Sequence, residues 1–312
     1  MSKHRIEVSA RRPLAIWRYC DGLRGHENQT AGLTEALARR IPIACTDVRV
    51  QGRFGATSGE PETGGPDLVI GAGHRTHRAL LKAKARTSAR AVLLMRPSGA
   101  TSRFDLCVIP QHDRPDEQLE AHRPAVLCTR GVLNRVTPSS SERSGATVVA
   151  IGGPSRHHDW LGAELLAQLT EIAARASDAA PLTVTNSRRT PVETWSAIES
   201  AQLPHTQLVE WARQPAGWLV EQMATASTVW VTEDSVSMVY EALSSGAGVG
   251  LLAIPRRRVS RVLHGVTALI ADGSVTLFQM WQQGASITAP RTPLAEADRV
   301  ARWIVERWLN VR

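Results

Sequence analysis

The stretch TVWVTEDSVSMVYEALSSGAGVGLL, residues 228–252, predicts a buried strand, a short polar turn, a helix and a second strand. Its apolar run at 229–231 is typical of a strand covered on both faces. Glu233, Asp234 and Ser235 are residue types that cap a helix, and we expect that helix over about 236–245, ended by Gly246. The stretch is one βαβ unit, which indicates a parallel sheet.

The polar turn of this unit is a candidate phosphate site. Ser235 and Ser237 lie where the first turn of the helix presents free N–H groups and the positive end of its dipole. Glu241 follows about one and a half turns later, within reach of a sugar hydroxyl. A capping Ser235 and a solvated Glu241 would explain the same residues without a ligand, and the stretch by itself leaves both interpretations open.

Length and composition bound the class of protein. A chain of 312 residues suits two α/β domains of about 150 residues each. No apolar run reaches the roughly 18 residues of a membrane span, and the start of the chain lacks the apolar core of a signal peptide. The four cysteines have neither disulfide nor zinc spacing, so we expect reduced thiols, no metal site and a cytoplasmic protein.

The net charge of +8 lies in the first half of the chain. Residues 1–140 contain 22 basic and 13 acidic side chains, whereas the remainder contains 15 basic and 16 acidic ones. Such a surface attracts anionic membrane or phosphorylated glycans. Nucleic acid is not an expected partner, because no nucleic-acid motif is present and the tryptophans are not interleaved with arginines.

Short apolar strands alternate with helical patterns along the chain, as in doubly wound α/β domains. The ser-rich segment TPSSSERSGA, residues 137–146, is the expected linker, and residues 293–312 form an expected amphipathic helix. In the first half we expect strands at 14–19, 67–70, 91–95 and 106–109. We expect one helix at 29–40 and a second that follows the loop GAGHRTH, residues 71–77, and ends at residue 86. In the second we expect strands at 147–151, 182–185, 207–209 and 229–231, with helices at 160–176, 217–226 and 236–245.

Six strings in order resemble one family. DGLRGHENQTAGLTEAL, FDLCVIPQHD, VLCTRGVLNRV, VAIGGPSRHHDW, TNSRRTP and VTEDSVSMVYEA together are similar to the mitochondrial-fission "elongated mitochondria" family, over about residues 17–252. Bacterial members of that family are described as glycosyltransferases or nucleoside-diphosphate-sugar epimerases. The resemblance implies an α/β, GT-B-like architecture of two Rossmann-like, doubly wound domains facing across a cleft. The implied domains are 1–140 for the acceptor and 141–290 for the nucleotide sugar, with a C-terminal helix, 291–312, crossing back to the first domain.

The resemblance places the donor in the second domain, at three strand ends. Gly152 and Gly153 would let backbone approach a pyrophosphate beside Ser155 and Arg156, although a tight turn also needs glycine. Arg188 and Arg189 would grip the diphosphate, unless they are a solvated pair. Ser235 and Ser237 would meet the distal phosphate, and Glu241 resembles the ribose-binding glutamate of glycosyltransferases with this fold.

The first domain would then hold the acceptor and a general base. His26, Asp21 and Asp113 are the expected catalytic candidates, from the loop CDGLRGHENQ and from QHD, and Glu27 is a further one. Gly25, Asn28, Gln29 and His112 are the expected acceptor-binding residues. His157 and His158 are expected at the surface, and His74 in an exposed loop.

The resulting expectation is a metal-independent, hexosyltransferase-like glycosyltransferase acting in cell-envelope glycan or lipopolysaccharide synthesis. Its two substrates would be a nucleotide-diphosphate sugar and a glycan or lipid-linked acceptor. No cofactor is expected. The basic first domain would let this cytoplasmic protein contact the inner membrane peripherally. A nucleoside-diphosphate-sugar 2-epimerase and a non-enzymatic scaffold, as in fission, are the alternatives.

Overall fold

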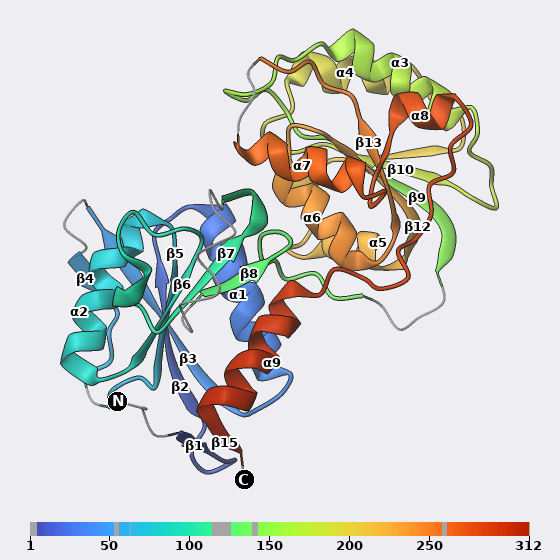
Figure 1. Cartoon of the computed structure of the whole chain (residues 1–312). Helices are drawn as coiled ribbons and strands as arrows, with labels where there is room; N and C mark the ends of the chain where they lie inside the picture. Colours follow the sequence, from blue (N-terminus) through green and yellow to red (C-terminus); the bar gives the residue numbers. More distant parts are fainter. Residues whose placement is uncertain are drawn as a thin grey trace. The chain divides into compact units, whose positions relative to one another are not determined.

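The computed structural model describes residues 5–52, 56–62, 64–113, 126–138, 143–257 and 261–311, with the side chains of 261–264 left aside. It divides into two compact units, Met1–Arg135 together with Ala295–Arg312, and Val136–Leu294 (Figure 1). The predicted boundaries were 140/141 and 290/291. Of the predicted linker, residues 139–142 lie outside the described part of the chain.

The first unit is built on a seven-stranded sheet in the order β4-β3-β2-β5-β6-β7-β8, parallel except for the edge strand β4. Its strands are β2 (Leu14–Cys20), β3 (Ile43–Gln51), β4 (Ala56–Ser58), β5 (Leu68–Ala72), β6 (Arg90–Leu94), β7 (Leu106–Pro110) and β8 (Val126–Thr129). Every residue of β5, β6 and β7 is buried. Helices on both faces explain these uninterrupted apolar runs.

Helices cover both faces of this sheet. On one face, α1 (Arg24–Ala38) and α9 (Glu296–Trp308) share a core with Leu33, Leu37, Val300 and Ile304 at its centre (Figure 1). On the other face, α2 (His77–Thr87) buries Leu80 and Ala83. The C-terminal helix is thus part of the first unit.

The end of the chain differs from the expected single helix over residues 293–312. Helix α9 stops at Trp308, and β15 (Leu309–Val311) pairs in parallel with β1 (Ile6–Val8). The start of α1 also differs, because the predicted loop before residue 29 already contains the first turns of the helix, from Arg24. Gly25, His26, Asn28 and Gln29 are therefore helical residues.

The second unit has a six-stranded parallel sheet in the order β11-β10-β9-β12-β13-β14. Its strands are β9 (Ser144–Ala150), β10 (Leu182–Thr185), β11 (Thr206–Val209), β12 (Ala226–Thr232), β13 (Gly248–Leu252) and β14 (Thr276–Leu277). Its helices are α3 (Gly162–Ala173), α4 (Val192–Ser200), α5 (Trp218–Thr225), α6 (Val236–Ser245), α7 (Arg261–Ala271) and α8 (Phe278–Gln282).

The βαβ unit predicted at residues 228–252 is confirmed as β12, α6 and β13. Its glycines have a packing role, since a Cβ at Gly250 would lie 2.5 Å from Cδ2 of Trp230 on the neighbouring strand. Trp230 in turn makes edge contacts with Phe278 and Trp281. The strand pair therefore closes only around a residue without a side chain.

Each sheet reverses its strand order once. In the first unit the chain winds from β2 outward to β3 on one side and to β5 on the other; in the second it winds from β9 to β10 and to β12. In open α/β sheets, ligands bind beyond the carboxyl ends of the strands at such a switch point. The residues after β2 and β5, and those after β9 and β12, are therefore where a site is expected. None of the described helices is both long and apolar enough to cross a bilayer.

Candidate functional site

At the switch point of the second unit, the N–H groups of Gly152 and Gly153 donate hydrogen bonds to side chains that follow or end β12. The Gly152 N–H donates to Thr232 Oγ1 at 2.7 Å, and the Gly153 N–H donates to Asp234 Oδ2 at 3.1 Å. A Cβ at Gly152 would lie 2.7 Å from Asp234 Cγ, and one at Gly153 would lie 2.7 Å from Arg189 Cβ. Both glycines are thus required by close packing within the protein, and their N–H groups already have acceptors.

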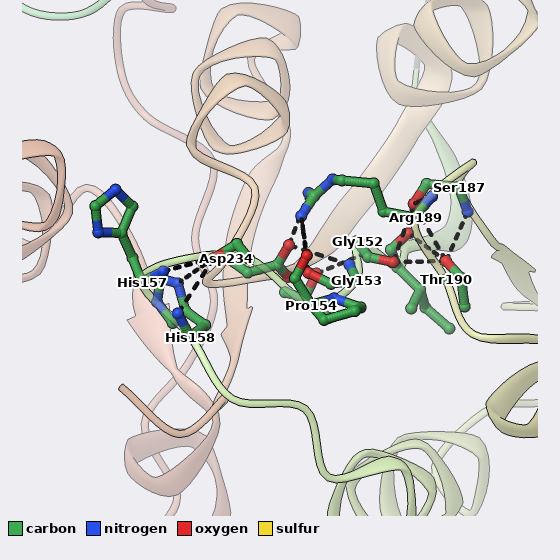
Figure 2. Close-up of polar contacts among 12 residues, drawn as sticks. Gly152, Gly153, Pro154, His157, His158, Ser187, Arg189, Thr190 and Asp234 are labelled. Carbon is green, nitrogen blue, oxygen red and sulfur yellow. Dashed lines mark hydrogen bonds and ion pairs between the residues drawn. The ribbon is translucent and has the colours of Figure 1, made fainter. Parts of the chain in front are cut away.

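Asp234 and Arg189 join three strand ends (Figure 2). The Asp234 side chain is fully buried and accepts Arg189 Nη2 at 2.7 Å. Arg189 Nη1 also donates to the carbonyl of Gly153 at 2.7 Å. The predicted capping role of Asp234 is wrong, because its carboxylate binds the loops after β9 and β10 instead. Two nitrogens of Arg189, a predicted diphosphate ligand, are engaged by the protein itself.

Hydroxyl groups hold the carbonyl side of the same glycine loop. Thr190 Oγ1 donates to the Gly152 carbonyl at 2.5 Å, and Ser187 Oγ donates to it at 3.0 Å (Figure 2). The Ser187 N–H donates to Thr190 Oγ1 at 2.8 Å. The loops after β9 and β10 are therefore locked together on both sides of Gly152.

Ser155 shapes the loop that follows. Its Oγ accepts the N–H groups of His157 and His158, each at 3.2 Å. His158 is buried rather than at the surface, with 2 % of its area exposed, because its segment pairs with Arg256. Arg156 and Arg188, in contrast, are exposed, as a ligand-binding guanidinium would need to be.

Glu233 connects the same edge of the sheet to a fourth strand end, that of β13. Its Oε2 accepts Nε of Arg256 at 3.0 Å and Nη2 at 2.8 Å, which ties the end of β12 to the loop after β13. Burial raises the pKa of the Glu233 carboxyl, and the Arg256 guanidinium opposes that rise. This charged pair is a structural tie on the rim of the switch point.

Helix α6 starts at the expected residue. Ser235 is its N-cap, although the Ser235 side chain makes no capping hydrogen bond. Ser237 is exposed in the first turn and Glu241 is half-buried further along. No acidic residue lies in the first turn, so the positive end of the α6 dipole is not offset there.

We expect the free energy of unfolding to fall as the pH drops below about 6.5. Burial lowers the pKa of His158, His77 and His112. The unfolded chain then binds protons that the folded protein does not, so the stability present above the ordinary histidine pKa is lost below it, by up to about 1.4 kcal/mol per pH unit for each histidine.

Denaturant unfolding at about pH 7.5 and about pH 5.5 measures this loss. His158→Gln should reduce the difference between the two pH values, whereas His205→Gln, at an exposed histidine paired with Asp178, is the matched control. An unchanged pH dependence in His158→Gln would contradict the assignment.

The switch point of the first unit holds a carboxylate–imidazole pair. Asp21 directly follows β2, and its Oδ2 lies 2.8 Å from His26 Nδ1. The Asp21 side chain is fully buried, whereas that of His26 is 19 % exposed. Asp21 Oδ1 also accepts the Leu23 N–H at 3.1 Å. A buried carboxylate thus fixes the ring of a histidine that solvent reaches.

Gly73, after the neighbouring strand β5, provides the space for that ring. A Cβ there would lie 2.7 Å from His26 Nδ1 and 2.9 Å from Nε2. The φ angle of Gly73 is +73°, in the region that favours glycine. Two adjacent strand ends therefore position His26.

The other predicted residues of the first unit lie in two places. Gln29 is buried with its Nε2 donating to the Gly25 carbonyl at 3.3 Å, and Gly25 is exposed with open space around its Cα. Asn28 is half-buried in the same helix. His112 and Asp113 follow β7, three strand spacings from β2, or about 14 Å. They do not join the Asp21–His26 pair at the switch point.

The sequence pattern missed the roles of Asp234, Thr190 and Gly73. A signal was present, since each directly follows an apolar strand or belongs to the loop after one. Among the described residues, no cluster of three or more metal-ligating side chains is found.

Solved structures confirm the α/β, GT-B-like fold. A UDP-GlcNAc 2-epimerase from Methanocaldococcus jannaschii is similar over 96 % of this chain and 100 % of its own, with a TM-score of 0.58 at 9 % identity. The glycosyltransferase of kitacinnamycin matches over 95 % and 100 %, with a TM-score of 0.53 at 12 % identity. A UDP-GlcNAc 2-epimerase from Neisseria meningitidis, bound to UDP-GlcNAc, matches over 96 % and 99 %, with a TM-score of 0.52 at 13 % identity.

Two relatives are similar in sequence. The mitochondrial fission protein ELM1 of Arabidopsis thaliana is 25 % identical over 221 residues, 60 % of this chain, and the match spans about half the relative's length, 52 %. An uncharacterized protein of Rickettsia prowazekii is 23 % identical over 288 residues, 77 % of this chain and 79 % of its own. The family model described as Mitochondrial fission ELM1 matches residues 24–308. The chain therefore belongs to the mitochondrial fission ELM1 family, as the resemblance predicted.

Proposed function

We propose that this protein is a glycosyltransferase that moves a sugar from a nucleotide-diphosphate donor to a hydroxyl of a cell-envelope glycan or lipid-linked acceptor. The Asp21–His26 pair carries the proposal, because a buried carboxylate that orients a solvent-accessible imidazole is a general-base arrangement that a scaffold does not need. The fold that the chain shares with nucleotide-sugar enzymes supports it.

In the proposed reaction, Nε2 of His26 accepts the proton of the acceptor hydroxyl. Its Nδ1–H donates to Asp21 Oδ2, and the Asp21 charge stabilises the imidazolium that forms. The acceptor oxygen bonds to the anomeric carbon of the sugar while the bond from that carbon to the diphosphate oxygen breaks. The nucleoside diphosphate leaves with that electron pair.

The second unit would hold the donor. The exposed guanidinium groups of Arg156 and Arg188 and the first turn of α6, with Ser235 and Ser237, are suited to the negative charge of a departing diphosphate. We assign Arg189 mainly to holding Asp234 and the Gly153 carbonyl. The proposal requires no metal ion for this stabilisation.

Glu241→Ala is expected to weaken the binding of a nucleotide sugar about tenfold, because a carboxylate that accepts a ribose hydroxyl contributes about 1.5 kcal/mol. Isothermal titration calorimetry of the two proteins measures the change in Kd. Glu199→Ala, at an exposed position of α4 in the same unit, is the matched control. Unchanged affinity in Glu241→Ala would show that the ribose lies elsewhere.

A nucleoside-diphosphate-sugar 2-epimerase is the second candidate, favoured by the match to the entire length of one such enzyme at a TM-score of 0.58. The two functions differ in their need for an acceptor. Incubation with a nucleotide sugar alone, followed by chromatography of the sugar nucleotide, separates them: conversion to an epimer supports the epimerase, and a dependence of turnover on added acceptor supports the transferase. A fission-type scaffold, which the family name suggests, predicts no nucleotide-sugar affinity.

A further inference from the structure

A large cavity in the first unit is lined by Asp21, the partner of His26. Its volume is about 980 Å³, and it lies at the carboxyl ends of β2, β3, β5 and β6. The described residues that line it include five basic side chains, namely His74, Arg75, His77, Arg78 and Arg103. Ligand-binding cavities in proteins have about this volume. The basic lining of this cavity favours an anionic ligand.

Four of the five basic residues lie at the start of α2, where the helix dipole disfavours a positive charge. His74 and Arg75 lie in the 3-10 helix that leads into α2, and His77 and Arg78 are the first two residues of α2. The first turn of α2 has no acidic residue. A cation near a positive helix end is destabilising, and an anion in the cavity would be attracted both by that helix end and by the guanidinium groups.

Among the described residues, no acidic side chain pairs with Arg75 or Arg103. Asp21 is the acidic residue of the described lining, and its two oxygens are directed to His26 Nδ1 and the Leu23 N–H. Within the described lining, the carboxylate of Asp21 therefore stands against the three guanidinium groups of Arg75, Arg78 and Arg103.

His77 adds an unused hydrogen-bonding atom. Its ring is held edge-on against Phe104, with 5.6 Å between ring centroids. Its Nε2 is buried and has no hydrogen-bond partner in the part of the chain that the structure describes. Ser98 and Gly99, after β6, add a hydroxyl and backbone to the lining. Guanidinium groups and the N–H groups at a helix N-terminus are donors that bind phosphate oxygens well.

We propose that this cavity binds a ligand that carries a phosphate or diphosphate group. Its identification as the acceptor rests on the proposed function, because the cavity shares Asp21 with the proposed base. The acceptor would then be a phosphorylated glycan or a lipid-linked diphosphate, held by its phosphate while its hydroxyl is presented to His26.

Titration of inorganic pyrophosphate into the full-length protein, followed by calorimetry, tests the site. We expect saturable binding that the double variant Arg75→Gln, Arg103→Gln weakens about a hundredfold or more, since each lost charge-assisted hydrogen bond contributes about tenfold or more in affinity. The matched control is Arg11→Gln, Arg302→Gln, which removes two exposed arginines of the same unit that do not line the cavity. Unchanged pyrophosphate affinity in the Arg75, Arg103 variant would overturn the proposal, as would an equal loss in both double variants.

Nucleotide-sugar binding by the same variants separates this proposal from the proposed function. The cavity variant should retain that affinity, because the donor residues lie in the second unit. Pyrophosphate binding lost in the cavity variant, without any nucleotide-sugar affinity in the wild type, would keep the anion site and remove the glycosyltransferase. Sedimentation with vesicles of phosphatidylcholine and phosphatidic acid in equal parts, against phosphatidylcholine alone, then distinguishes a lipid-borne phosphate from a soluble one.

Discussion

His26→Ala is expected to lower the turnover number of the proposed transfer by about 10²- to 10⁴-fold while leaving the Kd for the nucleotide sugar unchanged. The substitution removes the imidazole proposed to take the acceptor proton, whereas the residues proposed to bind the donor lie in the second unit. Steady-state rates at saturating donor and acceptor, together with calorimetry, separate the two effects.

Three variants sharpen this experiment. Asp21→Asn keeps the size of the buried side chain but removes the charge that stabilises the imidazolium, so it should lower turnover as well. Gly73→Ala removes no chemical group and should still lower turnover, because its Cβ displaces the His26 ring. His205→Ala, in an exposed pair with Asp178 at the same 2.8 Å distance, should change nothing. Full turnover in His26→Ala would make Asp113 or Asp21 the leading base.

Asp234→Ala is expected to lower the free energy of unfolding by about 3 kcal/mol. The variant leaves the Arg189 guanidinium and the Gly153 N–H without their buried acceptor. The loops after β9, β10 and β12 then lose the side chain that connects them. Removing one partner of a buried ion pair lowers the free energy of unfolding by about 3–5 kcal/mol. The lower value is expected here because the Arg189 side chain is 38 % exposed and water can replace part of the interaction.

Equilibrium denaturant unfolding measures the loss, and Asp178→Ala is its matched control. Asp178 also pairs with a basic side chain in the second unit, but it is 98 % exposed, so its removal should cost less than about 1 kcal/mol. Asp234→Asn, which retains an acceptor for Gly153, should lie between the two. A loss in Asp234→Ala no larger than in Asp178→Ala would show that the buried pair does not hold the loops.

The sequence predicted the central strands well because parallel strands covered on both faces are uninterrupted apolar runs. β10 and α6 have the predicted bounds, and β5, β6 and β7 lie within two residues of them. Strand β3 was missed because much of it is exposed and its composition has no such run. β1 and β15 were missed for a different reason: three-residue strands from opposite ends of the chain are defined only by their pairing.

For the site, the sequence found which residues lie at strand ends but not how they pair. Asp21 and His26 were both selected because they lie in the segment that follows the first strand, and the start of α1 brings the two side chains together. Asp234 and Arg189 are 45 residues apart, and only the order of β10, β9 and β12 in the sheet brings them into contact. The sequence also held a local signal for the basic cavity that we did not interpret, namely four basic residues among the five at 74–78, where α2 begins.

The most direct measurement of the central claim is calorimetric titration of the wild-type protein with uridine, guanosine, cytidine and thymidine diphosphate sugars. The account predicts saturable binding of at least one of them, at one site per chain, which identifies the donor nucleotide. No binding across the whole panel, from a protein shown by its unfolding transition to be folded, would contradict it and leave the scaffold as the function of this fold.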